Sequence, residues 1–189
     1  MRRTFRQMSR VVTPVDTFDD IWVAQDVYVT ASTTRRSAGI LLYRRTGPAG
    51  VEVLLAHPGG PIWARKDEGS WSLPKGLIDP DESEWDAARR EFLEEIGSPV
   101  PDGPHIELGE VKLKSGKIVV GFAVEGDLDV STVISNTFEM AWPPRSGRMQ
   151  SFPEIDRAEW FDPETAKKKL NPAQAPLVER LLEALPAAG

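Results

Sequence analysis

The sequence contains no cysteine and only two histidines, His57 and His105, among 189 residues. The absence of cysteine excludes disulfides, thiolate catalysis and thiolate zinc sites. With so little histidine, a bound metal would need mainly oxygen ligands, which favours magnesium, manganese or calcium. No apolar run is long enough to cross a bilayer, so we expect a soluble, cytoplasmic chain with no membrane partner.

An excess of basic residues is also absent, because the formal net charge is −6. Proteins that bind nucleic acid usually carry a basic surface, so we expect no nucleic-acid partner. A small phosphorylated ligand bound through a metal remains compatible with this acidity. The composition, 40% hydrophobic and 28% charged, predicts one compact domain with a sizeable core. The oligomeric state is left open, and a homodimer is one of the possibilities.

Residues 1–34 form a segment of different character, which we interpret as an N-terminal extension. Four arginines precede the first acid, Asp16. Such a composition is typical of a flexible basic terminus and also of an organellar transit peptide. Alternating apolar residues between Phe18 and Thr30 indicate an edge strand or an arm. The remaining residues, 35–189, are predicted to form the main domain.

The pattern of apolar runs and turn residues in 35–189 alternates strands and helices. Residues 38–43 and 51–56, joined by a Gly/Pro turn, predict a hairpin. Further strands are expected at 106–113, 118–124 and 157–161. A strong helix is predicted over 82–96, with Asp81 as its cap, Glu84 completing a capping box, and Gly97 ending it. Two C-terminal helices are predicted to start at Asp162-Pro163 and Asn171-Pro172.

The 82–96 helix separates acidic from apolar residues. Helical spacing puts Glu91, Glu94 and Glu95 on one side. The opposite, apolar side is expected to bury against the sheet and consists of Trp85, Ala88, Phe92 and Ile96. Three clustered carboxylates repel one another unless a cation lies between them, and hard divalent cations prefer such oxygen ligands. By this spacing alone, a solvated charged face and a metal site are both open.

Two neighbouring features favour the metal site. Arg90 is adjacent to the acidic cluster and can hold a carboxylate in a bidentate contact. The segment Pro74-Lys75-Gly76 lies just before the helix and can bring backbone carbonyls and a lysine to the same place.

The segment from Gly76 to Gly97 resembles the Nudix box, a pattern of glycine, glutamate and arginine at fixed intervals. The residues that match it are Gly76, Glu82, Arg90, Glu91, Phe92, Glu94, Glu95 and Gly97. Only Ser98 departs, where an aliphatic residue is usual. The resemblance, to bacterial-type NTP pyrophosphohydrolases, implies an α/β fold with a mixed β-sheet sandwiched between α-helices. It also implies Mg²⁺- or Mn²⁺-dependent cleavage of a phosphoanhydride bond in a nucleoside diphosphate linked to another moiety.

The resemblance also implies roles for the box residues. Glu91, Glu94 and Glu95 would bind the metal, with Glu91 oriented by Arg90. Glu94 or Glu95 would act as the catalytic base, and Arg90 would support catalysis. Glu82 and Gly97 would be structural. Family members differ in the position of the base, and two acids outside the box are alternatives, although each is more simply an exposed surface acid: Glu139 and Glu154.

The approach to the box, Trp71 to Gly76, resembles that of dinucleoside polyphosphate and diphosphoinositol phosphate hydrolases. The residues expected to contact the substrate are Lys75, Gly76, Arg65 and Lys66. Three tryptophans near predicted loops are candidates for stacking on a base: Trp63, Trp71 and Trp142.

Other functions are open within this resemblance. Nucleotide-sugar pyrophosphatases and enzymes that remove mutagenic nucleotides remain candidates. A non-catalytic, nucleotide-binding regulator on the Nudix fold is the alternative from another class, but it would normally show gaps in the acidic motif, and there are none. An isoprenyl diphosphate isomerase is disfavoured because that chemistry needs a cysteine.

Overall fold

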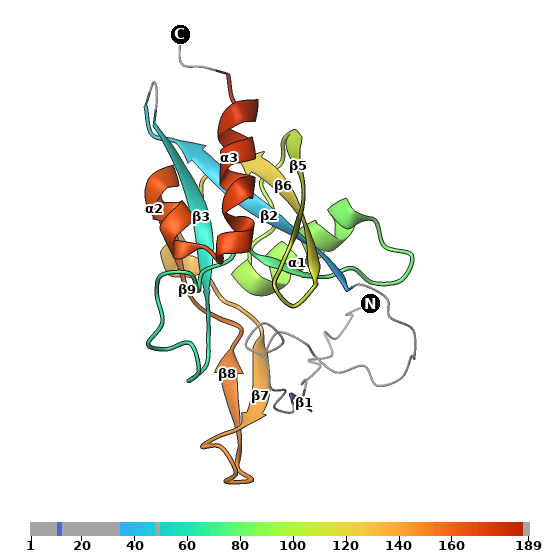
Figure 1. Ribbon diagram of the computed structural model, residues 1–189, viewed down its shortest axis with the longest axis vertical. Coiled ribbons are helices and arrows are strands. Elements are labelled where there is room, and N and C mark those ends of the chain that lie inside the picture. The colour runs from blue at the N-terminus through green and yellow to red at the C-terminus, as the bar shows by residue number, and fades with distance from the viewer. Residues whose placement is uncertain (1–10, 13–34, 48–49, 187–189) are drawn as a thin grey trace, which may run out of the picture.

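The computed structural model describes residues 11–12, 35–47 and 50–186, arranged as in Figure 1. Apart from Val11 and Val12, the N-terminal extension lies outside the described residues, and so does the strand or arm predicted between Phe18 and Thr30. Within the described part of the chain, no helix is long and apolar enough to cross a membrane.

The main sheet is mixed. Its five-strand path is β5 (His105–Lys112), β6 (Ile118–Glu125), β2 (Arg36–Arg45), β3 (Val51–Pro58) and β9 (Ile155–Phe161). Strands β2 and β6 are parallel, and each of the other neighbouring pairs along this path is antiparallel. A sixth strand, β4 (Lys75–Leu77), pairs antiparallel with the start of β2. The hairpin predicted from 38–43 and 51–56 is β2–β3, and β5, β6 and β9 confirm the other predicted strands with small shifts at their ends.

Helices cover both faces of this sheet (Figure 1). Alternate residues of β2 point to opposite faces, as a strand requires. Ile40 and Leu42 pack in a core with the apolar side of α1 (Glu84–Ile96). Leu41 and Tyr43 pack in a second core with α2 (Pro163–Lys169) and α3 (Ala175–Ala184). This arrangement confirms the predicted mixed sheet between helices.

The prediction for the start of α1 was wrong by two residues. Ser83, not Asp81, is the N-cap, and its side chain accepts a hydrogen bond from the backbone N–H of Asp86. Asp81 has a φ of 66°, in the turn that precedes the helix. Glu84 forms an ion pair with Arg36 at 2.6 Å instead of closing a capping box. Gly97 ends the helix with a φ of 80°, as predicted.

The C-terminal helices follow the prediction in part. Asp162 caps α2 by accepting from two backbone N–H groups, and Pro163 is the first helical residue. Asn171-Pro172 starts a 3-10 turn, η2 (Pro172–Gln174), and α3 begins only after it. In α3, Leu177, Val178 and Leu181 are buried, whereas Leu182 is 38% exposed.

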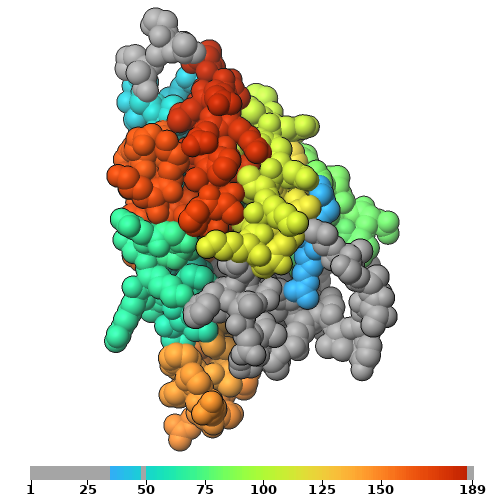
Figure 2. Space-filling view, viewed as in Figure 1, coloured from blue at the N-terminus to red at the C-terminus, as the bar shows by residue number. Residues whose placement is uncertain are grey.

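A second, small sheet was not predicted. It joins β1 (Val11–Val12), β7 (Thr137–Ala141) and β8 (Met149–Pro153). A 3-10 turn, η1 (Val130–Thr132), precedes β7 in the chain. The β7–β8 hairpin projects from the body of the protein, and forms the lower end of the molecule in Figure 2. None of the side chains of β7 and β8 is fully buried, so the sequence there lacks the apolar run that marks a core strand.

Gly39 allows β4 to lie against β2. It pairs with Lys75, and a Cβ at this position would lie 2.4 Å from the backbone oxygen of Pro74. Because a backbone atom cannot move aside as a side chain can, the glycine is required by this close approach.

We therefore expect Gly39→Ala to destabilise the fold by about 1 to 3 kcal/mol, as overpacking does. The measurement is urea denaturation, compared with Ser37→Ala on the same strand. The Ser37 hydroxyl is buried without a hydrogen-bond partner among the described residues, so its removal should be neutral or stabilising. Equal stabilities for Gly39→Ala and the parent would contradict the steric role of Gly39.

Candidate active site

The site is built where the backbone of β4 passes close to α1. A Cβ at Gly76 would lie 1.9 Å from the carboxyl carbon of Glu91, so any other residue here would push this carboxylate out of its position. On the other edge of β4, Gly76 pairs with Ala38 of β2. The glycine therefore lets a strand of the sheet contact the carboxylates of the helix directly.

Arg90 links three segments of the site. Its Nε and one terminal nitrogen donate to the two carboxyl oxygens of Glu82 at 2.9 and 2.8 Å. The same terminal nitrogen donates to the Leu77 carbonyl oxygen at 2.8 Å, and the other donates to Glu91 at 2.7 Å. The carboxylate held in a bidentate contact is that of Glu82, while Glu91 receives one N–H from Arg90. The predicted structural residue Glu82 lies where it can fix Arg90.

Glu91 and Glu95 are buried carboxylates, 8% and 4% exposed. One oxygen of Glu95 accepts a hydrogen bond from the backbone N–H of Lys75 at 3.0 Å. Burial raises the pKa of Glu91, and it raises the pKa of Glu95 to about 8, a shift to which the charges of Glu91 and Glu154 add. Because the two buried carboxyls raise each other's energy when both are ionised, the binding of a positively charged ligand between them would be favourable.

The other candidate acids lie at different distances from this pair. Glu94 is partly exposed, and its carboxylate lies 3.6 Å from Arg90. Glu154, at the junction of β8 and β9, acts electrostatically on Glu95. Glu139 lies within β7, opposite Ser151 on the projecting hairpin. The structure thus brings Glu154, but not Glu139, to the buried carboxylates.

The donor set fits a hard divalent cation, since the side chains that gather here offer carboxylate oxygens. Within the described ranges, however, no three acidic, histidine or cysteine side chains already converge as a metal site requires. Glu91 is turned to Arg90 and Glu95 to the Lys75 amide. These carboxylates would therefore need to rotate to share one ion.

Lys75 is buried close to the carboxylates, and a second lysine, Lys117, lies beside it. Burial and, to a lesser degree, the charge of Lys75 lower the pKa of Lys117 to about 7, a shift that the charges of Glu95 and Glu91 oppose. The sequence did not identify Lys117, which directly precedes β6 in a segment interpreted only as a turn. No local pattern marks it, because it reaches the site through the pairing of β6 with β2.

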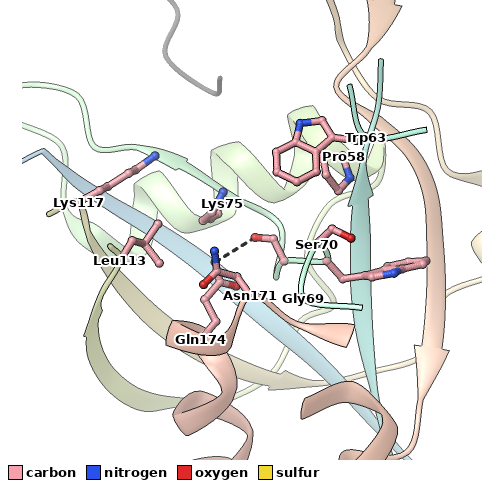
Figure 3. A pocket seen from close by; sticks show the side chains of 11 residues that line it. Pro58, Trp63, Gly69, Ser70, Lys75, Leu113, Lys117, Asn171 and Gln174 are labelled. Carbon is pink, nitrogen blue, oxygen red and sulfur yellow. Dashed lines mark hydrogen bonds between the residues drawn. The ribbon is translucent and has the colours of Figure 1, made fainter. Parts of the chain in front are cut away.

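An open pocket adjoins the two lysines. Figure 3 shows Lys75 and Lys117 at one side of the pocket and Trp63 at the other. Its floor includes residues from the segment before β4 and from the turn before α3: Ser70, Trp71, Ser72, Asn171 and Gln174. The Gln174 side chain is fixed there, because it donates to the Ser72 hydroxyl at 3.3 Å and accepts from the Leu73 N–H at 3.2 Å.

The three candidate tryptophans are in different environments. Trp63 is partly exposed and lines the pocket. Trp71 is only 1% exposed and its indole N–H donates to Asp67 at 2.9 Å, so it belongs to the core and cannot offer a free face. Trp142 directly follows β7, away from the pocket lining.

The two predicted loop cations also differ in their surroundings. The Lys66 ammonium lies 4.3 Å over the Trp63 ring, whereas Arg65 is exposed, and neither residue lines the pocket.

Comparison with known proteins gives two curated relatives. One is an 8-oxo-(d)GTP phosphatase of Mycolicibacterium smegmatis, 39% identical over 92 residues, or 44% of this chain and 26% of the relative. The other is an RNA pyrophosphohydrolase of Bartonella henselae, 39% identical over 74 residues, or 38% of this chain and 40% of the relative. The matched part is thus less than half of either relative.

Solved structures with the same fold include a Caenorhabditis elegans Ap4A hydrolase in a binary complex. It has a TM-score of 0.51 and 22% identity, over 78% of this chain and 96% of that one. The NUDIX domain of Shewanella oneidensis NrtR, complexed with ADP ribose, has a TM-score of 0.57 and 17% identity, over 84% and 94%. At these identities the likeness concerns the fold alone.

The family comparison covers most of the chain, because residues 33–181 match the NUDIX domain. The match includes the β4–α1 unit with its buried glutamates, Arg90 and the close approach of Gly76. This chain therefore belongs to the Nudix family.

Proposed function

We propose that this protein is a metal-dependent hydrolase that cleaves a phosphoanhydride bond in a nucleoside diphosphate linked to another moiety. The observation that carries the proposal is the pair of buried carboxylates, Glu91 and Glu95, held beside the backbone of β4. A bound Mg²⁺ or Mn²⁺ supplies charge neutralisation for the phosphates and makes water a better nucleophile. Burial of carboxylates without such a ligand would only destabilise the fold.

The roles of the residues follow from their contacts. Glu91, Glu94 and Glu95 would hold the ion, and Arg90 keeps Glu91 in place while being held by Glu82. A carboxylate must accept the proton of the attacking water. Among the acids outside the box, Glu154 suits this role because it lies near Glu95, whereas Glu139 is on the hairpin.

The substrate is proposed to lie with its phosphates at Lys75 and Lys117 and its nucleoside in the adjoining pocket. Two lysines lie beside the carboxylates, and a bound phosphate chain would favour the charged form of Lys117 in spite of its lowered pKa, so both could neutralise a chain longer than the metal alone can. The partly exposed ring of Trp63 can stack on a base. These features support a dinucleoside polyphosphate as the preferred substrate. An 8-oxo-guanine nucleotide is the second candidate, supported by the name of the Mycolicibacterium relative.

A metal requirement is the first test. We expect activity with Mg²⁺ or Mn²⁺ and its loss with excess chelator, because all proposed ligands are oxygen donors. Glu95→Gln keeps the shape of the side chain but removes its charge, so turnover should fall on the order of a hundredfold or more while the fold persists. Glu183→Gln, an exposed change on α3, is the control and should keep the parent rate. Full turnover in verified metal-free buffer would refute the proposal.

Stability of the metal-free protein should fall as pH rises. The pKa of Glu95 is raised from 4.5 in an ordinary carboxyl to about 8 in the folded protein, so the folded state binds more protons than the unfolded state. The stabilisation that comes from the raised pKa is fully present below the ordinary carboxyl pKa of 4.5. It is lost as the pH rises through the pKa of about 8 in the folded protein. The slope is at most about 1.4 kcal/mol per pH unit for one group.

The measurement is denaturation in chelator at several pH values between these two limits. Glu95→Gln should give a shallower loss of stability with pH than the parent, because it has no proton to release. Added Mg²⁺ should restore most of the stability of the parent at the upper limit and little of that of the variant. If stability fell with pH equally in parent and variant, the pKa of Glu95 would not be raised in the folded protein.

The preference for a long phosphate chain can be tested separately from hydrolysis. We expect kcat/KM for diadenosine tetraphosphate to exceed kcat/KM for ATP, dGTP and 8-oxo-dGTP in one buffer with one metal. Lys117→Ala and Lys75→Ala should both lower this ratio if the lysines contact the distal phosphates. Arg65→Ala, at an exposed cation outside the pocket lining, is the matched control. A ratio at or below one would reject the preference and leave the hydrolase proposal intact.

A further inference from the structure

The segment of residues 134–136 lies between the C-terminal end of α1 and the start of β7, and its backbone is bound to the helix. The N–H of Ile134 donates to the carbonyl oxygen of Ile96 at 3.2 Å. The N–H of Asn136 donates to the carbonyl oxygen of Glu94 at 3.1 Å. Carbonyls in the last turn of a helix have no partner within the helix, so this segment supplies one. It is thereby fixed to the helix that carries the proposed metal ligands.

The same segment holds the backbone of Glu154, which lies where β8 leads into β9 (Figure 1). The carbonyl oxygen of Asn136 accepts from the N–H of Glu154 at 2.8 Å. The hydroxyl oxygen of Ser135 accepts from the N–H of the next residue, Ile155, at 3.0 Å. The direction of this bond is unambiguous, because a backbone N–H can only donate. Ser135 therefore joins the segment at α1 to the first residue of β9 through its side chain.

The strand pairing is irregular where Glu154 lies. The register between β3 and β9 shifts between His57 and Pro58, and Pro58 is the residue opposite Ile155. Beyond the shift, the N–H of Gly59 donates to the carbonyl oxygen of Glu154 at 2.9 Å. Because a ladder is locally disrupted at such a shift, contacts from outside the ladder contribute more to the position of the backbone. The bond from Ile155 to Ser135 is a contact of this kind.

We propose that Ser135 is a positioning residue that holds the backbone of Glu154, the proposed proton acceptor, in place relative to the carboxylates of α1. Glu154 lies close enough to Glu95 for its charge to add to the raised pKa of that carboxyl. A base must lie within hydrogen-bond reach of the proton it accepts, and a misplacement of about 1 Å can cost about a hundredfold in rate. This inference rests on the proposed function, because it assigns proton transfer to Glu154.

The informative variant is Ser135→Ala, which removes the hydroxyl and leaves the backbone contacts of the segment. We expect kcat to fall about tenfold and KM to stay within about twofold of the parent, because the lysines and the pocket are untouched. The assay uses Mg²⁺ and whichever of four nucleotides the parent hydrolyses fastest: diadenosine tetraphosphate, ATP, dGTP or 8-oxo-dGTP. Ser131→Ala is the matched control, because this exposed hydroxyl bonds to Asp129 in the turn η1, and both constants should stay at the parent values.

A double-mutant cycle distinguishes positioning from a general loss of structure. Glu154→Gln removes the proton acceptor, so kcat should fall about a hundredfold or more by this change alone. If Ser135 acts through Glu154, adding Ser135→Ala to Glu154→Gln should lower kcat by no more than about twofold further. A structural role of Ser135 would instead lower kcat in Glu154→Gln by the same factor as in the parent.

Amide hydrogen exchange of the proteins in chelator, without nucleotide, gives a readout independent of activity. Residues 154–156 should exchange faster in Ser135→Ala than in the parent, because the N–H of Ile155 loses its acceptor on Ser135. The same residues should exchange at the parent rate in Ser131→Ala.

Four results would overturn the proposal: an unchanged kcat in Ser135→Ala, the same loss of kcat from Ser135→Ala in Glu154→Gln as in the parent, unchanged exchange at residues 154–156, or a parent level of kcat in Glu154→Gln. The last of these would leave the hydrolase proposal intact, with the base in the box. If the parent hydrolyses none of the four nucleotides, the proposed function fails, and the exchange measurement alone decides whether Ser135 holds the backbone of Glu154.

Discussion

The site depends on how closely the backbone of β4 approaches α1. Gly76 leaves room for the carboxyl group of Glu91, which a Cβ at this position would displace. On the other side, Gly39 of β2 meets the same segment without a clash. Because Gly76 leaves room for α1 and Gly39 leaves room for β4, the sheet and the helix can share the short strand between them. The backbone N–H of Lys75 then reaches Glu95 inside the protein.

This contact carries an energetic cost that links the fold to its chemistry. Taking two carboxylates out of water disfavours their charged forms, as the raised pKa values of Glu91 and Glu95 record. Arg90, the Lys75 amide and the charge of Lys75 offset part of the cost, but Arg90 is shared with Glu82 and the Leu77 carbonyl, and Glu154 adds a further negative charge. The site is therefore short of positive charge in the protein itself. A divalent cation together with a phosphate chain would complete its electrostatics.

The parts of the molecule that could be predicted from sequence are those set by local spacing. The intervals of the box put Glu91, Glu95 and Arg90 on one side of α1, and the opposite apolar side indeed packs on β2. The helix start was misplaced because Ser83 and Asp81 are both good caps, and only the turn geometry decides between them. The β7–β8 hairpin was missed because it buries no side chain fully, so it has no hydrophobic pattern to detect.

The residues proposed to bind substrate could not be predicted in this way, because they are far apart in the sequence. Lys117 reaches Lys75 only through the parallel pairing of β6 with β2, and the pocket joins a loop after β3 to the turn before α3. A change in loop length or strand register would alter these contacts without altering the box. The box residues proposed for catalysis are thus encoded within one helix and the strand before it. Those proposed to recognise the substrate are brought together by the tertiary fold, which is why the box alone indicates the chemistry but not the nucleotide.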